Sequence, residues 1–296
     1  MKIALLFPGQ GAQKMGMGLD FYEAFPHVKS IYDEYPLIRD ICFKNENDGL
    51  SHTLTTQQAI LLTSVSIASL LKKHCPFHAM AGLSLGEYSA LVSSEALSLE
   101  DAMPLIQKRG SLMQEALKDH DTGMSAIISE DLALIKKIVV EASHIGVCSI
   151  ANINAPNQVV MSGSKEALDY AKTKLVEAGI RKVIPLRVAG AFHSAYLKEV
   201  SHPLKEALQS VSWDTSTCPI ILNVDAQPHT HSFIEPLSMQ IYSSVLWMDS
   251  LKSLEALGID TMIEIGPSST LSSMIQATCP DIKHYVVNDV TSFEKT

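Results

Sequence analysis

A serine lies between two glycines in the segment Gly82-Leu-Ser84-Leu-Gly86, which fits the pattern G-x-S-x-G. This pattern is typical of a nucleophile elbow, a sharp turn from a strand into a helix. Glycine suits both ends of the turn because the flanking backbone comes too close for a β-carbon. At the start of the helix, free N–H groups favour a developing oxyanion, and the N–H of Leu85 would be the first donor. Any short segment rich in glycine and serine can match, so the motif alone leaves a catalytic and a structural role open.

A serine hydroxyl needs a base before it can attack an acyl group. Among eleven histidines, His193 differs by its position in the segment Val188-Ala-Gly-Ala-Phe-His193. That segment returns the chain from a predicted insert to the main sheet, and such junctions can reach the carboxyl ends of parallel strands, where α/β proteins keep their sites. Most single histidines have no catalytic role, but the position of His193 makes it the candidate base.

Arg109 lies in Gln107-Lys-Arg-Gly110, on the helix that is predicted to follow the elbow. Its spacing on that helix favours an exposed face in contact with solvent. The alternative is a bidentate clamp on a substrate carboxylate, a task that suits a planar guanidinium better than an ammonium group.

Two kinds of element alternate around these residues. Short apolar runs predict buried strands, and longer runs with helical spacing predict helices. The strands are expected at residues 3–7, 79–81, 219–222, 263–265 and 285–287, and the helices at 55–73, from 86, at 98–118 with Ser98 as N-cap, after 193, and at 268–278. Strands that alternate with helices predict a mainly parallel sheet in an α/β fold.

A separate pattern occupies residues 123–189. Strands are expected at 124–128, 147–153, 158–161 and 182–188, with helices at 132–143 and 164–178. This order, β-α-β-β-α-β, is that of a ferredoxin-like unit. Pro185 within the last strand predicts a sheet edge, because proline cannot donate to a central ladder. We therefore expect a large catalytic subdomain from residues 1–122 and 190–296 and a small inserted subdomain from 123–189.

Composition narrows the class of protein. Hydrophobic residues make up 46% and the net charge is −9, which favours a globular enzyme and disfavours general binding to nucleic acid or anionic membrane. The five cysteines are odd in number and form no C-x-x-C pair, which is typical of free thiols in a reducing compartment. The apolar run at 59–71 is too short and too interrupted for a membrane span, so a buried helix is expected there. No metal-ligand cluster and no phosphate-binding loop is visible in the sequence.

Seven motifs in the same order resemble one family. They are Phe7-Pro-Gly-Gln10-Gly-Ala-Gln13, Gly82-Leu-Ser84-Leu-Gly-Glu87, Lys108-Arg109-Gly110 with Met113-Gln114, Ile153-Asn-Ala-Pro-Asn-Gln-Val-Val160, Gly190-Ala-Phe-His193-Ser194, Asn223-Val-Asp-Ala226 and Glu264-Ile-Gly-Pro267. Together they resemble malonyl-CoA:acyl carrier protein transacylases and the acyltransferase domains of polyketide synthases, over essentially the whole chain.

The resemblance implies a hydrolase-like α/β subdomain with a ferredoxin-like insert, and a role for each matching residue. Ser84 would carry the malonyl group, and His193 would be its base. Arg109 would pair with the malonyl carboxylate, and the backbone N–H groups of Gln10 and Leu85 would form the oxyanion hole. Phe192, the residue before His193, resembles the form of the family motif that is associated with malonyl rather than methylmalonyl substrates. The resemblance also implies malonyl-CoA as donor and an acyl carrier protein of fatty-acid or polyketide synthesis as acceptor. No cofactor, nucleic acid or membrane is implied, and a cytoplasmic monomer is expected.

Two positions depart from the family. Leu83 stands where the family often has histidine, and Leu246 stands where it commonly has glutamine or arginine. The resemblance implies that a backbone carbonyl of the segment 243–247 orients His193, with a carboxylate from Asp225 or Asp249 as the second option.

Two rival functions share part of these features. A serine hydrolase of acyl thioesters would use the same serine and histidine but would have no use for a buried arginine, and a non-catalytic docking module would need none of the three. Four basic residues form either a docking patch for the acidic carrier protein or ordinary solvated charges: Lys172, Lys174, Arg181 and Lys182.

Overall fold

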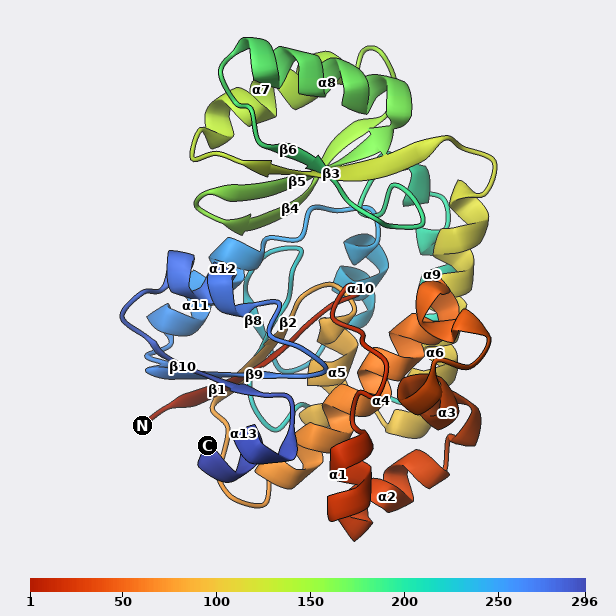
Figure 1. Cartoon of the computed structure of the whole chain (residues 1–296), viewed down its shortest axis with the longest axis vertical. Helices are drawn as coiled ribbons and strands as arrows, with labels where there is room; N and C mark the ends of the chain where they lie inside the picture. Colours follow the sequence, from red (N-terminus) through yellow and green to blue (C-terminus); the bar gives the residue numbers. More distant parts are fainter.

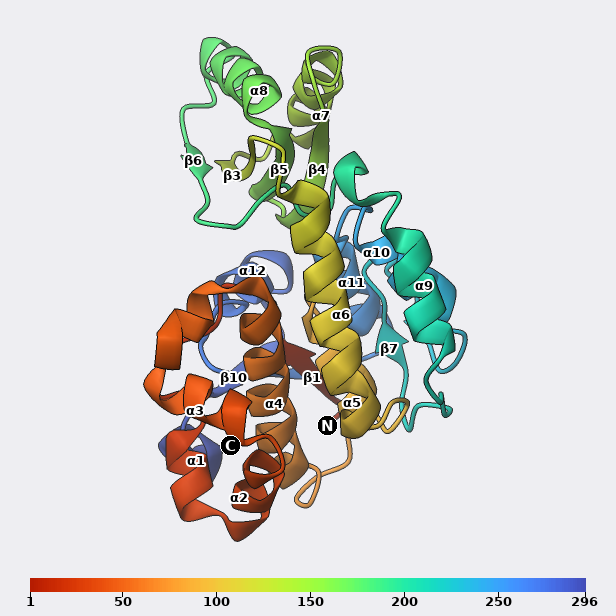
Figure 2. The same ribbon diagram turned by 90° about the vertical axis from the view of Figure 1, so that its right-hand side faces the viewer.

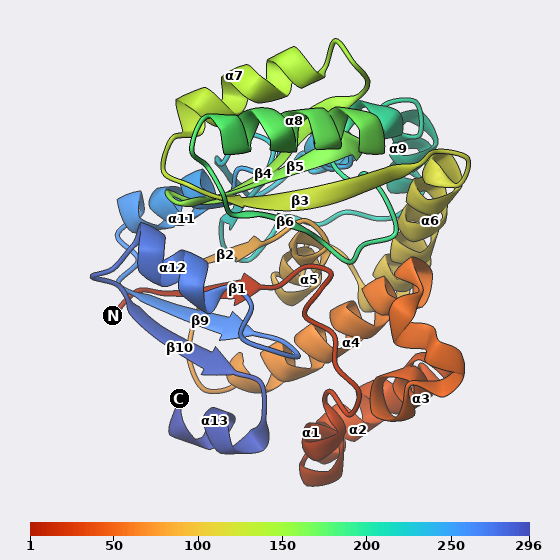
Figure 3. The ribbon, with the colours of Figure 1, turned by 45° about the horizontal axis from the view of Figure 1, so that its top comes forward.

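The computed structural model describes residues 1–296 and holds two β-sheets, one in each part of the molecule (Figure 1). The main sheet has six strands in the order β10-β9-β1-β2-β7-β8, and only the β7–β8 pair is antiparallel. Its strands are β1 (Ile3–Phe7), β2 (Ala79–Gly82), β7 (Ile220–Ile221), β8 (Pro228–His229), β9 (Thr261–Ile265) and β10 (Lys283–Val287). The mainly parallel sheet predicted from the sequence is confirmed, and Figure 3 shows β10, β9, β1 and β2 side by side.

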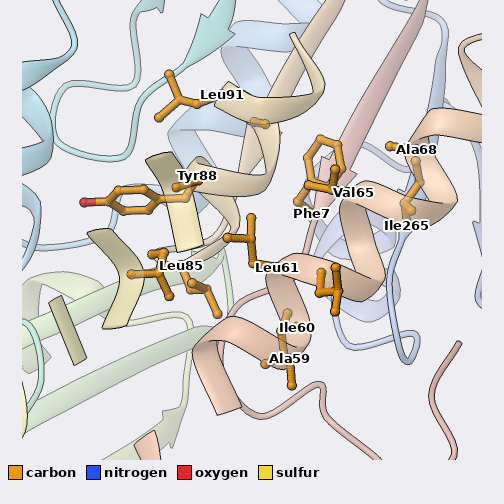
Figure 4. Packing of buried hydrophobic residues seen from close by; sticks show 14 of the residues in the cluster. Phe7, Ala59, Ile60, Leu61, Val65, Ala68, Leu85, Tyr88, Leu91 and Ile265 are labelled. Atoms are coloured by element: carbon orange, nitrogen blue, oxygen red, sulfur yellow. The ribbon is translucent and has the colours of Figure 1, made fainter. Parts of the chain in front are cut away.

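Both faces of the main sheet are buried, which explains why its strands are continuous apolar runs. In β1, Leu5 and Phe7 belong to the cluster that includes α4 (Thr53–Leu71) and α5 (Gly86–Ser93). The alternate residues Ala4 and Leu6 belong to a second cluster with α11 (Trp247–Ala256) and α12 (Ser272–Thr278). Figure 4 shows Phe7 among the side chains of α4 and α5. The neighbouring strand β2, which leads into the nucleophile turn, is packed in the same way, with Met80 in the first cluster and Ala79 and Ala81 in the second.

Helix α4 is the predicted buried helix. It is long and apolar enough to cross a membrane by length and composition, but 83% of its apolar window is buried inside the protein. It packs against α6 (Leu99–Leu117) and α5. We conclude that α4 is a core helix of this fold.

The second sheet lies in the predicted insert and is entirely antiparallel, in the order β4-β5-β3-β6. Its elements are β3 (Thr122–Ile128), α7 (Leu132–Ala142), β4 (Cys148–Ala155), β5 (Gln158–Ser164), α8 (Lys165–Glu177) and β6 (Val183–Pro185). The two helices cover the face turned away from the main sheet and close a separate core of 14 buried residues (Figure 1). The β-α-β-β-α-β order is confirmed. The last strand is shorter than predicted because it ends at Pro185, on the edge of the sheet where the proline was expected.

The two sheets are joined by covalent and hydrogen-bonded links. Helix α6 begins with Ser98 as its N-cap, which accepts a 3.0 Å bond from the backbone of Asp101, and the chain passes from its end into β3 (Figure 2). On the other side, the backbone of Val245 donates to Ala151 over 2.8 Å and accepts from Ile153 over 3.0 Å. The edge strand β4 is thereby fixed to the main body.

Further helices complete the large part of the molecule, several of which the sequence analysis did not predict. They are α1 (Leu19–Ala24), α2 (Pro26–Asp33), α3 (Pro36–Lys44), the 3-10 helices η1 (Glu46–Ser51) and η2 (Ala195–Leu197), α9 (Ser201–Gln209), α10 (Ile234–Gln240) and α13 (Val290–Lys295). The helix expected after His193 is present as η2 and α9. All five cysteines are free.

Candidate active site

The turn between β2 and α5 is the predicted elbow. Ser84 has φ 53°, in the left-handed region that side chains rarely adopt. A β-carbon on Gly82 would lie 1.8 Å from the carbonyl carbon of Gly86, and one on Gly86 would lie 2.2 Å from the oxygen of Phe7. Only glycine fits at these two positions, so the pattern G-x-S-x-G has a steric cause in this fold.

Three neighbouring parallel strands deliver polar residues to the same edge of the sheet. Gln10 follows β1, Ser84 follows β2 and Asn223 follows β7. The side chain of Asn223 accepts the backbone N–H of Ser84 over 2.7 Å and donates to the carbonyl of Gly82 over 2.8 Å. One carboxamide thus holds both sides of the strained turn.

His193 lies beside the serine, as predicted. Its Nε2 is 2.8 Å from Ser84 Oγ, and its Nδ1 is 2.8 Å from the carbonyl oxygen of Gln240. Because a carbonyl only accepts, Nδ1 carries the proton and Nε2 is left to accept the serine proton. Burial, and then the charge of Arg109, lowers the pKa of His193 to about 4. The imidazole is therefore neutral at physiological pH, which is the state that a general base needs.

A backbone carbonyl orients His193, but the residue that supplies the 2.8 Å contact lies outside the predicted segment. It is Gln240, the last residue of α10, while the backbone of Ser243, within the predicted segment 243–247, adds a second hydrogen bond that favours the protonated imidazole. The Gln240 carbonyl belongs to the last turn of α10 and has no partner within the helix, and it also accepts the backbone N–H of Ser243 over 3.3 Å. The carboxylate option is wrong, since Asp225 pairs with His229 at 2.9 Å and Asp249 lies 4.0 Å from Lys252.

Arg109 is buried, with only 1% of its surface exposed, so the exposed helix face that its spacing favoured is wrong. Its Nη1 donates to Gln57 Oε1 over 2.9 Å, and its Nη2 donates to Gln240 Oε1 over 2.8 Å and to Ser84 Oγ over 3.1 Å. Burial lowers the pKa of Arg109 from its ordinary value, but guanidinium stays charged at neutral pH. A fixed cation therefore lies within hydrogen-bond distance of the nucleophile.

A buried carboxyl group, that of Glu87, lies in the first turn of α5 and supports the same residues. It accepts hydrogen bonds from the backbone N–H of Asn223 and from Gln240 Nε2. Burial raises the pKa of Glu87 to about 8, against the opposing effect of these two donors and of Arg109. Gln240 also donates from Nε2 to the carbonyl of Ser84 over 2.8 Å, so its side chain contacts the cation, the elbow and the carboxyl group.

Four of these residues have no role predicted from the sequence: Gln57, Glu87, Asn223 and Gln240. Glu87 and Asn223 lay inside the quoted motifs, which was the only available signal. Gln57 lies on a helix that the sequence predicts and Gln240 on one that it does not predict. Neither spacing nor composition distinguishes these two glutamines from the others in the chain.

A cavity of about 220 Å³ opens onto the nucleophile. Besides Ser84, His193 and Arg109, it is lined by the three other predicted site residues: Gln10, Leu85 and Phe192. The backbone N–H groups of Gln10 and Leu85 donate to no acceptor in the protein, so both are available to a bound group. The predicted residues are thus brought together around one space.

Of the other residues singled out from the sequence, one lines the cavity, one contributes its backbone and the basic residues of α8 lie elsewhere. Leu83 lines the cavity, and the backbone of Leu246 donates to the carbonyl of Asn223 over 2.9 Å. Lys172 and Lys174 lie on α8, on the outer side of the small sheet, where Lys174 pairs with Glu177 at 2.8 Å (Figure 1). The structure contains no group of three or more His, Cys, Asp or Glu side chains placed to hold a metal ion.

Comparison with known proteins assigns the chain to a family. Residues 4–292 match the family described as acyl transferase domain. A malonyl CoA-acyl carrier protein transacylase of Bacillus subtilis is 36% identical over 99% of this chain and 95% of its own length. A crystal structure of the corresponding protein, abbreviated MCAT, from Streptococcus pneumoniae superimposes with a TM-score of 0.95, at 38% identity, over 99% of this chain and 98% of the other.

One solved structure includes a partner. It is a type II PKS acyl-carrier protein in complex with its malonyl-transacylase, and its matching chain has a TM-score of 0.96 and 30% identity over 100% of this chain and 98% of the other. The match extends over the elbow, the insert and the strands that carry the site. This chain belongs to the acyl transferase domain family.

Proposed function

We propose that this protein transfers a malonyl group from malonyl-CoA to the phosphopantetheine thiol of an acyl carrier protein, for fatty-acid or polyketide synthesis. The observation that carries the proposal is the buried, charged Arg109, which donates to Ser84 Oγ over 3.1 Å. A cation at this distance suits an acyl donor whose far end is a carboxylate. The named relatives, which are malonyl transacylases, support the same substrate.

The first half of the reaction loads the serine. Malonyl-CoA binds with its carboxylate on Arg109, and Ser84 Oγ attacks the thioester carbonyl while His193 Nε2 takes the hydroxyl proton. The oxyanion that forms is stabilised by the N–H groups of Gln10 and Leu85. The intermediate collapses by breaking the carbon–sulfur bond, and the CoA sulfur leaves with the proton from His193. Malonyl-Ser84 remains.

The second half repeats these steps with the other thiol. The carrier thiol gives its proton to His193 and attacks the ester carbonyl of malonyl-Ser84. Collapse of the second intermediate releases the Ser84 oxygen, which regains the proton from His193. Phe192 lines the cavity, and we propose that its bulk disfavours a methylmalonyl branch.

We further propose that the chain is divided into two subdomains. Residues 1–122 and 190–296 would form the catalytic subdomain and residues 123–189 the ferredoxin-like subdomain, with its own core of 14 buried residues. We propose that a monomer is the active unit, because one chain supplies every residue of the site. The free cysteines suit the reducing cytoplasm.

The experiment compares malonyl-CoA consumption with and without a holo carrier protein. We expect malonyl-Ser84 to form on the enzyme alone, detected by mass spectrometry of the peptide, and to be discharged rapidly only when the carrier thiol is added. Release of free malonate as fast without carrier protein as transfer with it would identify a hydrolase instead. Absence of label on Ser84 would leave only a docking role.

A further inference from the structure

Two carboxamide side chains on β4, those of Asn152 and Asn154, line the cavity and have no place in the reaction described above. Both are buried, with 7% and 5% of their surfaces exposed. The pairing of β4 with β5 shifts register twice here, between Ile150 and Asn152 and between Ile153 and Ala155. Bulges of this kind re-aim side chains and are frequent beside active sites.

The polar atoms of Asn154 indicate that this position serves a ligand. Its Oδ1 is buried and has no hydrogen-bond partner in the protein. A buried polar atom without a partner is unfavourable for the folded state, and native proteins retain few of them. Because Asn154 lines the cavity, its unpaired acceptor can be satisfied when a molecule bound there brings the donor.

The strand that carries Asn154 is held firmly relative to the nucleophile. Val245 bonds to the backbone of β4 on both sides of Asn152, at 2.8 and 3.0 Å. The next residue, Leu246, donates to the carbonyl of Asn223 over 2.9 Å, and Asn223 in turn holds the backbone of Ser84 over 2.7 Å. The segment 245–246 and Asn223 therefore fix the backbone of the strand that carries Asn154 relative to the elbow, as recognition of a substrate requires.

The chemistry of the donor limits what can pair with this acceptor. The malonyl thioester itself offers only acceptors, namely its carbonyl and carboxylate oxygens. The pantetheine arm, by contrast, has a secondary amide two methylene groups from the sulfur, with an N–H donor and a C=O acceptor. A cavity of about 220 Å³ is too small for a whole coenzyme but has room for the acyl group and the first part of the arm.

We propose that Asn154, with Asn152 beside it, binds the pantetheine amide nearest the sulfur, and that Asn154 Oδ1 accepts the N–H of that amide. This assignment rests on the proposed function. Because CoA and the carrier protein share the same arm, one carboxamide site serves both halves of the reaction. It selects thioesters of pantetheine and places their carbonyl carbon over Ser84.

The test uses two small malonyl donors that differ in one group. One is the S-malonyl thioester of N-acetylcysteamine, which keeps the amide, and the other is the S-malonyl thioester of 2-acetoxyethanethiol, in which an ester oxygen replaces the N–H. The rate of malonyl-Ser84 formation is measured on the intact protein by mass spectrometry, and each rate is divided by the rate of the same thioester with hydroxide. This normalisation removes any difference in intrinsic reactivity.

For the unmodified protein we expect the amide to be preferred about tenfold, the usual effect of one hydrogen bond in a protected site. In Asn154→Leu, which has a similar volume but no acceptor, the preference should fall to about one. Asn157→Ala is the matched control, because Asn157 is exposed in the turn after β4, and it should keep the full preference.

Equal rates for the two donors with the unmodified protein would overturn the assignment, and that result does not depend on whether a variant folds. A preference that survives in Asn154→Leu would also overturn it, because the donor would then pair elsewhere or with water. If malonyl-Ser84 forms normally from malonyl-CoA but shows no amide preference, only this assignment fails. If malonyl-CoA never labels Ser84, the proposed function fails as well.

Discussion

Replacement of Arg109 by methionine tests the clamp on the malonyl carboxylate. Methionine keeps an unbranched side chain in the buried space between Gln57, Gln240 and Ser84 but removes the charge and all three hydrogen bonds. We expect the variant to lose most of its malonyl transfer and to retain acetyl transfer relative to it, because an acetyl group has no carboxylate to pair.

The magnitude follows from the burial of Arg109, which is 1% exposed. Removing one partner of a buried charge pair costs about 3–5 kcal/mol. At 1.4 kcal/mol per factor of ten, the ratio of kcat/KM for malonyl-CoA over acetyl-CoA should fall by roughly a hundredfold to a few thousandfold. The lost bonds to Gln57, Gln240 and Ser84 affect both acyl groups alike, so their effect cancels in the ratio.

The assay measures acylation of Ser84 by malonyl-CoA and acetyl-CoA in separate reactions and in direct competition. Lys108→Met is the matched control, since Lys108 is the exposed neighbour on the same helix and the substitution removes one positive charge as well. An equal loss for malonyl and acetyl in Arg109→Met, with the ratio unchanged, would refute the clamp. The same shift of the ratio in Lys108→Met would attribute the effect to net charge.

Three further predictions concern the groups around the nucleophile. The pKa of His193 is lowered to about 4, so the rate of malonylation should stay constant as the pH falls well below 6.5. Below pH 6.5 the unfolded chain binds a proton at this histidine and the folded protein does not, so the free energy of unfolding should fall between about pH 6.5 and 4. The variant His193→Gln should lack that part of the pH dependence in denaturant titrations. The pKa of Glu87 is raised to about 8, so the folded protein keeps a proton that the unfolded chain loses above its ordinary pKa of 4.5. Relative to Glu87→Gln, the unmodified protein should therefore lose free energy of unfolding as the pH rises from 4.5 to about 8. Parallel plots of the free energy of unfolding against pH for the two proteins would contradict this. The substitution Gly86→Ala places a β-carbon 2.2 Å from the oxygen of Phe7, so the melting temperature should drop and acylation of Ser84 should be lost. An unchanged melting temperature and acylation rate would mean that the elbow tolerates a side chain.

The sequence alone determined the features that depend on neighbours along the chain. The elbow could be predicted because its glycines, its serine and the helix start lie within five residues, and the steric reason for them is local. The ferredoxin-like order could be predicted because the periodicity of strands and helices is also local, and Pro185 marks its edge for the same reason. The ends of elements were less certain: the helix expected from residue 268 begins at Ser272, since packing, not propensity, decides the boundary.

The resemblance of several motifs to one family supplied what local patterns could not, namely the pairing of Ser84 with His193 across 109 residues. It did not give the environment of these groups. Arg109 has the spacing of an exposed helix residue, and only the packing of α6 against α4 buries it beside Gln57.

Tertiary structure alone decided which groups support the chemistry. The carbonyl of Gln240 reaches His193 from a helix 47 residues away, and the side chain of Asn223 reaches the Ser84 backbone across 139 residues. Hydrogen bonds of this kind depend on where the ends of strands and helices meet in space. Nothing in the order of residues identifies the partner of a side-chain amide or a backbone carbonyl. The sequence therefore determined the reacting groups, and the fold determined their charge state, their orientation and the unpaired acceptor of Asn154, a residue that lines the cavity.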